Sequence, residues 1–91
     1  MKKLLHQIKV NCSDNPEIRK INLPEAEYVD CSYDPQLKKI NLPNAIEVYC
    51  SNNPQLKEIN LPKAEKVWCY DNPELDFNKI RVPKTCKIAY F

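Results

Sequence analysis

Cysteine has the most reactive side chain in this protein, and four of the five cysteines recur at a regular spacing. They lie about 19 residues apart, at Cys12, Cys31, Cys50 and Cys69. Regularly spaced thiols can form disulfides or bind zinc, but both require side chains that converge on one another. A strict repeat instead places equivalent side chains in a straight column. We therefore expect a column of small, buried, uncharged side chains.

The other residues with catalytic potential are isolated. Cys86 aligns with Glu27, Ile46 and Glu65, a position expected to face outward, so we predict it to be the most reactive thiol. His6 has no evident nucleophile or carboxylate partner. No acid–base pair, nucleophile constellation or phosphate-binding loop is recognisable. We therefore expect no enzymatic activity, no cofactor and no bound metal.

The composition argues against several classes of protein. Ninety-one residues fit one small domain, and 14 basic against 12 acidic side chains give a net charge of +2. This near balance provides no strong field for nucleic acid or membranes. Residues 1–9 contain too short an apolar run for a signal peptide. We expect a protein that is soluble where it is made, in the cytoplasm or another reducing compartment.

Near-copies of residues 48–66 account for most of the chain after Val10. The recurring valines are Val10, Val29, Val48 and Val67, and the recurring prolines are Pro16, Pro35, Pro54 and Pro73. A fixed period of about 19 residues is typical of a solenoid, in which neighbouring coils bury each other's apolar edges.

Each coil contains two extended segments. Val48 and Cys50 alternate with polar and aromatic residues, which predicts a short strand with one buried face. Ile59 and Leu61 alternate again on the return arm, where Pro62 disfavours a helix and favours extended backbone. A coil of this length therefore leaves no room for a helix.

The turns must form without glycine, because the chain has none. Asparagine and aspartate tolerate a positive φ better than other residues, and every coil supplies them, at Asp14-Asn15, Asp34, Asn52-Asn53 and Asp71-Asn72. We expect Asn15, Asn53 and Asn72 to bond the backbone of the adjacent coil. A second outward ladder, formed by Asn22, Asn41 and Asn60, is expected to bond along the return arms.

The pattern Ala45-x-x-Val48-x-Cys50-x-x-Asn53-x-x-Leu56 resembles the core motif of leucine-rich repeats. The following Ile-Asn-Leu-Pro resembles the end of the shortest repeats of that family, which occur in secreted bacterial effectors. The resemblance implies a leucine-rich repeat solenoid with a parallel β-sheet on one face, extended or polyproline-like return arms, and little or no helix. It also implies export as an effector as one possible destination.

We interpret residues 1–91 as a single leucine-rich repeat domain. Residues 1–9 form a partial N-terminal coil, 10–83 form four repeats of which the last is two residues longer, and 84–91 form a terminal strand. Strands are expected near 9–13, 28–32, 47–51, 66–70 and 87–91, with any helix confined to about 74–80.

The outward positions of these strands vary between coils and collect aromatic residues, which are typical anchors of protein interfaces. The predicted partner-binding residues are Tyr28, Asp30, Glu47, Tyr49, Lys66, Trp68, Tyr70 and Phe91. This pattern favours a protein–protein interaction module that binds an unidentified protein through the sheet face. Packing of the aromatic side chains on their cross-strand neighbours is the alternative role for them.

A structural role is the second function class. The last strand has no coil beyond it, and an unpaired apolar edge invites self-association. The open ends of the solenoid are therefore an alternative route to homo-oligomers, in particular through the C-terminal edge.

Overall fold

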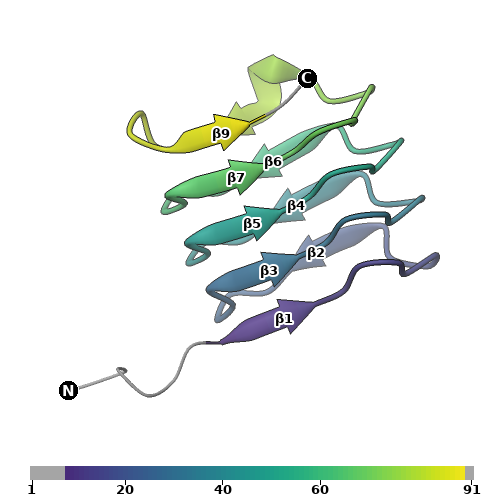
Figure 1. Cartoon of the computed structure of the whole chain (residues 1–91), viewed down its shortest axis with the longest axis horizontal. Coiled ribbons are helices and arrows are strands. Elements are labelled where there is room, and N and C mark those ends of the chain that lie inside the picture. Colours follow the sequence, from purple (N-terminus) through teal and green to yellow (C-terminus); the bar gives the residue numbers. More distant parts are fainter. Residues whose placement is uncertain (1–7, 90–91) are drawn as a thin grey trace.

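The computed structural model describes residues 8–89, and each coil contributes a short strand to each of two parallel sheets (Figure 1). The front sheet contains β1 (Lys9–Asn11), β3 (Tyr28–Asp30), β5 (Glu47–Tyr49), β7 (Lys66–Trp68) and β9 (Lys87–Ala89), in that order. The back sheet contains β2 (Lys20–Asn22), β4 (Lys39–Asn41), β6 (Glu58–Asn60) and β8 (Ile80–Arg81). The chain is therefore a parallel β-solenoid of about four turns, which confirms the predicted fold class at that level.

The repeat sets the register of both sheets. Val48 of β5 lies beside Val29 and Val67 in the front sheet, and Ile59 of β6 lies beside Ile40 and Ile80 in the back sheet. Identical or similar side chains therefore stack from coil to coil, as the sequence alignment predicts.

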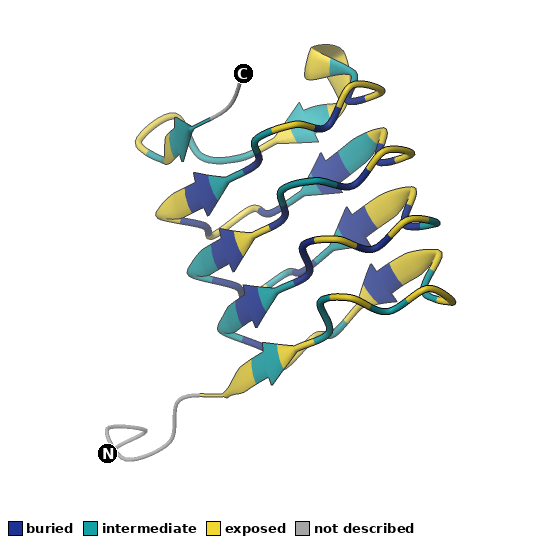
Figure 2. Ribbon diagram, turned by 45° about the vertical axis from the view of Figure 1, so that its right-hand side comes forward, coloured by how far each residue is buried: buried dark blue, intermediate teal, exposed yellow. Residues whose placement is uncertain are grey.

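The core is the space between the two sheets. The middle residue of each strand points into it, so the buried residues form a continuous stripe through the coils (Figure 2). Leu37, Leu42, Leu56 and Leu61 fill the space between the strands and are fully buried. Val10 and Ile88, in the first and last front strands, are only partly buried because they lie at the ends of the stack.

The return arm is more regular than the sequence predicts. We expected extended or polyproline-like backbone; the arms are extended, and they also pair as the back sheet, which we did not predict. The prolines permit this pairing because each lies beyond the strand. Pro62, for example, follows Leu61, whose own amide still donates to the Arg81 carbonyl at 2.8 Å.

The front strands are shorter than predicted, with three residues instead of five. Beyond Asp30 and Tyr49 some backbone bonds between coils persist, such as that from the Cys31 amide to the Tyr49 carbonyl at 2.7 Å, but serine side chains accept the bonds of alternate amides. The Ser51 amide donates to Ser32 Oγ at 3.1 Å, and the Tyr70 amide donates to Ser51 Oγ at 2.9 Å. Ser32 and Ser51, in the third predicted outward column, therefore bond the backbone of the adjacent coil instead of extending the sheet face.

The longer last repeat accommodates a single 3₁₀ turn, η1 (Phe77–Lys79). It begins after Asp76, whose side chain accepts a bond from the Asn78 amide at 2.9 Å. The chain then re-enters the back sheet at Ile80. Within residues 8–89, no helix has the length and apolar character needed to cross a membrane.

Each turn after the first four front strands contains one residue with a positive φ. These residues are Asp14, Tyr33, Asn52 and Asp71, with φ between 58° and 62°. In the second coil we predicted Asp34 to have this conformation, and the prediction is wrong because the left-handed residue is the preceding Tyr33. A tyrosine with a left-handed backbone places its Cβ close to the following carbonyl oxygen, which is unfavourable.

Replacing Tyr33 with asparagine should therefore stabilise the fold, because asparagine tolerates this conformation and Tyr33 is 58% exposed. We expect Tyr33→Asn to raise the free energy of unfolding by about 1 kcal/mol, measured by urea denaturation. Tyr33→Phe keeps the strain and serves as the control, with no change expected. An asparagine variant no more stable than the wild type would contradict the account.

Candidate functional site

The outer face of the front sheet is formed by the first and third residue of each front strand. The middle residue points into the core, so its neighbours face away from it. The first outward column consists of Lys9, Tyr28, Glu47, Lys66 and Lys87. The second consists of Asn11, Asp30, Tyr49, Trp68 and Ala89. Six of the eight predicted binding residues lie in these two columns.

Tyr49 and Trp68 form an aromatic stack at the centre of this face. Their ring centroids are 4.4 Å apart and the ring planes differ by 6°. The two residues are register partners on β5 and β7, and strands of a sheet lie about 4.8 Å apart. The in-register pairing therefore holds the rings parallel. Tyr49 remains 42% exposed, so the stack offers a rigid aromatic surface to a ligand.

A groove lies beside this stack. Trp68 pairs with Ala89 in the next strand, and the small alanine side chain does not continue the aromatic column. The resulting depression has a volume of about 310 Å³, and its lining comes from both strands: Lys66, Val67, Trp68, Lys87, Ile88 and Ala89. Lys87 and Ala89 were not among the predicted site residues. Their alignment with Lys66 and Trp68 is the signal that identifies them.

Charge is unevenly distributed over the face. Asp30 and Glu47 lie on β3 and β5, whereas Lys66 and Lys87 lie on β7 and β9. Asp30 accepts a bond from the Ser32 amide at 3.2 Å. Glu47 and Lys66 are register partners, yet they form no ion pair within residues 8–89. The face is therefore acidic over β3 and β5 and basic over β7 and β9, with one further basic residue, Lys9, on β1.

One predicted binding residue, Tyr70, lies beyond the strands that form this face. Tyr70 follows the end of β7, is half-buried, and donates its backbone N–H to Ser51 Oγ. The prediction that it continues the outward columns is wrong, because the front strands end before it. Phe91 lies outside the described residues, as do His6 and most of the predicted N-terminal partial coil.

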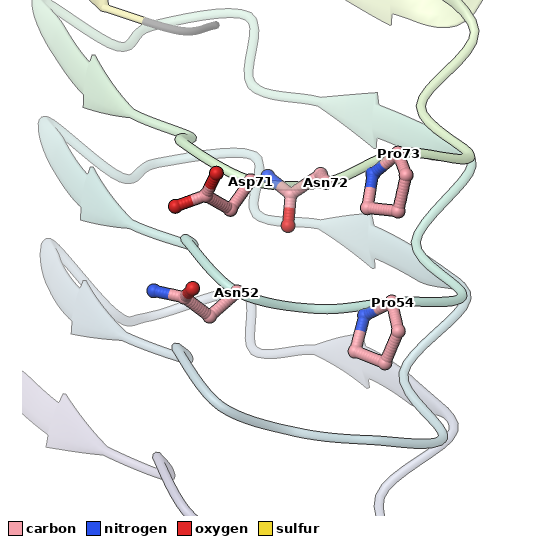
Figure 3. Close-up of a pocket in the computed structure, with 5 residues that line it drawn as sticks. All are labelled: Asn52, Pro54, Asp71, Asn72 and Pro73. Carbon is pink, nitrogen blue, oxygen red and sulfur yellow. The ribbon is translucent and has the colours of Figure 1, made fainter.

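A second depression lies at the edge of the turns (Figure 3). It has a volume of about 480 Å³ and is lined by Asn52, Pro54, Asp71, Asn72 and Pro73. The Asn72 amide group is already used, because its Nδ2 donates to the Cys50 and Cys69 carbonyls at 2.9 and 3.0 Å. The prolines contribute no side-chain donor. This depression therefore offers fewer groups for recognition than the front face.

The cysteine column is buried in the core, as predicted. Cys31, Cys50 and Cys69 are buried, Cys12 packs against the same cluster, and all are free thiols. Burial raises the pKa of Cys12 to about 11, and it raises the pKa of Cys31 as well. No group of three potential metal ligands occurs within residues 8–89.

Cys86 is less exposed than an outward position predicts. It is partly buried and packs against the core, and its thiol lies 3.6 Å from the Lys87 carbonyl oxygen. Burial raises the pKa of this thiol, which lowers its reactivity at neutral pH. Because Cys31, Cys50 and Cys69 are buried more deeply, the rank of Cys86 as the most reactive thiol stays a prediction.

A ladder of side-chain-to-backbone bonds joins the turns. The amides of Asn15, Asp34 and Asn53 each donate to the side chain one coil further on, at 2.8 Å. The predicted role is thus confirmed for Asn53 and Asn72. The Asn15 side chain instead accepts from the Glu17 amide in its own turn at 3.0 Å. On the back sheet, Asn60 donates to Asn41 at 2.9 Å, as the second ladder predicts.

Asp34 is the exception in this ladder, because it has a carboxyl group where Asn53 and Asn72 have amides. It is 0% exposed, and its Oδ2 has no hydrogen-bond partner within the described part of the chain. Burial raises the pKa of Asp34 above the usual 3.8, and nearby Asp14 and Asp30 add to this effect. The hydrogen bond from the Asn15 amide acts in the opposite direction and lowers the pKa of Asp34.

Comparison with protein-family models, with curated proteins and with solved structures finds no match for this chain. The assignment as a repeat solenoid therefore rests on the repeats and on the two stacked sheets.

Replacing Asp34 with asparagine should stabilise the protein at neutral pH. The amide can donate to the Cys31 carbonyl, as Asn53 does to Cys50 at 2.8 Å, and satisfying a buried polar atom is worth about 1–3 kcal/mol. The raised pKa means that the wild type keeps its stabilising proton below pH 3.8 and loses it as the pH rises through the folded pKa.

The gain in the free energy of unfolding of Asp34→Asn over the wild type should therefore grow from acidic to neutral pH. Urea denaturation across that range measures it. Asp76→Asn, at a partly buried turn position, is the matched control. An advantage of Asp34→Asn that is the same at every pH would contradict the assignment.

Proposed function

We propose that this chain is a non-enzymatic protein-interaction module of the leucine-rich repeat type, which binds a protein partner through the outer face of its front sheet. The observation that carries the proposal is the Tyr49–Trp68 stack, whose rings are parallel and 4.4 Å apart. Exposed aromatic residues held in one orientation lose little entropy on binding and are enriched in interface hot spots.

The solenoid itself does not require this stack. Stacking of the coils uses the inward residues, and Asn11 and Asp30 occupy the same outward column without aromatic rings. The stack is therefore a feature of the surface, added to a frame that is complete without it. Its position beside the groove over Ala89 gives a partner both a flat ring and a depression to contact.

The charges of the face favour a protein over nucleic acid. Lys66 and Lys87 attract anionic groups, but Asp30 and Glu47 on the adjoining strands would repel a continuous phosphate backbone. A protein surface can supply both signs. The buried free thiols are compatible with a reducing compartment such as the cytoplasm.

Assembly through the ends of the solenoid is a second candidate. β1 and β9 are the edge strands of the front sheet, and edge strands present unpaired backbone groups to another chain. Such assembly would add coils end to end and would leave the outer face unoccupied.

Replacing Trp68 with alanine tests the role of the face. We expect Trp68→Ala to weaken partner binding by about 2 kcal/mol, or roughly 30-fold, as hot-spot aromatic residues do. The loss of stability should stay below about 1.5 kcal/mol, the value of a stacked pair. Proteins retained by the immobilised chain are quantified by mass spectrometry, and thermal melts report the stability.

Lys39→Ala, on the exposed back sheet, is the matched control and should retain the same protein as the wild type. The opposite pattern, in which Trp68→Ala melts earlier but keeps its partner, would mean that the stack serves the sheet and not an interface.

A further inference from the structure

The outer face of the front sheet is complementary to itself. Numbering the front strands as rungs 1 to 5 from β1 to β9, the acidic residues Asp30 and Glu47 lie on rungs 2 and 3. The basic residues Lys66 and Lys87 lie on rungs 4 and 5, and a further one, Lys9, lies on the end rung 1. The aromatic stack lies between these halves, on rungs 3 and 4.

We propose that the partner of this face is a second copy of the same chain, bound face to face about a two-fold axis parallel to the front strands and passing between β5 and β7. This inference rests on the proposed function, because it uses the same face. Such an axis places rung 3 opposite rung 4 and rung 2 opposite rung 5, while each outward column faces its own equivalent.

The resulting pairs match in charge and shape. Glu47 faces Lys66 of the second copy, and Tyr49 faces Trp68 of the second copy. Tyr28 faces Lys87 of the second copy, an arrangement that suits a cation–π contact. Because the interface is two-fold symmetric, each of these pairs occurs twice.

In this arrangement a side chain of the second copy also fills the groove. Asp30 faces Ala89 of the second copy, where the groove of about 310 Å³ lies between Trp68 and Ala89. Lys66 and Lys87 line the same groove. The carboxylate of Asp30 would therefore enter a depression flanked by two ammonium groups.

Other arrangements of two copies are less complementary. An axis in the plane of the face but perpendicular to the strands would place each rung on itself, with Lys66 on Trp68 and Glu47 on Tyr49, and would form no pair of opposite charges. End-to-end stacking would continue the front sheet from β9 to β1 and place Lys9 beside Lys87, a pair of like charges.

The size of the face sets the expected affinity. Five strands about 4.8 Å apart, each with three residues of about 3.3 Å, cover on the order of 20 by 10 Å. The area of such a face is well below the roughly 800 Å² per partner that a standard interface buries. We therefore expect a weak, reversible dimer that forms in a concentration-dependent manner.

Charge reversal tests the pairing. Glu47→Lys places lysine opposite Lys66 twice in its own dimer, and Lys66→Glu places glutamate opposite Glu47 twice. Mixing the two variants restores opposite charges at both places. Sedimentation velocity from about 10 μM to about 1 mM covers the range of weak complexes.

We expect the wild type to dimerise with rising concentration and each variant alone to dimerise at least tenfold more weakly. An equimolar mixture should form a heterodimer at concentrations where each variant alone is monomeric. Within each variant chain positions 47 and 66 keep like charges, so recovery in the mixture reports contact between chains only. Lys39→Glu on the back sheet is the control and should dimerise like the wild type.

A wild type that stays monomeric, or a mixture no more dimeric than its components, overturns the inference. Oligomers that grow with concentration and are unaffected by both variants also overturn it, and they indicate assembly through the ends. If the wild type is monomeric but a retained partner is lost in Trp68→Ala, the proposed function stands and only the second copy as partner is excluded.

Discussion

The solenoid depends on one contact, the hydrogen bond from a backbone amide in each turn to a side chain of the next coil. The chain has no glycine, and the turns bury backbone amides that no strand pairing satisfies. The amides of Asp34 and Asn53 solve this problem by donating to Asn53 and Asn72 at 2.8 Å. Each coil must therefore place its turn directly over the one before it.

This constraint explains how one chain can have an invariant interior and a varied exterior. In-register coils stack valine on valine and cysteine on cysteine inside, and the same register aligns whatever lies outside. Tyr49 and Trp68 become a parallel stack because they occupy successive coils. Acidic residues likewise gather on β3 and β5 and basic residues on β7 and β9, with Lys9 alone at the β1 end, and this asymmetry makes self-recognition possible.

The sequence predicts the inward pattern well because that pattern repeats. Alternating valine and cysteine indicate the front strands, and the recurring asparagines indicate the turn ladder. The back sheet was missed because a proline near an extended segment does not show whether the strand before it can pair. The left-handed residue of the second turn was misplaced at Asp34 because residue type was weighed above repeat position: Tyr33 aligns with Asp14, Asn52 and Asp71, which all have a positive φ.

Amide hydrogen exchange, followed by NMR, tests the turn ladder most directly. The account predicts that the Asn53 amide exchanges as slowly as the Val48 amide at the centre of the front sheet. In Asn72→Ala, which removes the acceptor, the Asn53 amide should exchange much faster while the Val48 amide stays slow. An Asn53 amide that exchanges in the wild type as fast as that of the exposed Lys63 would contradict the account.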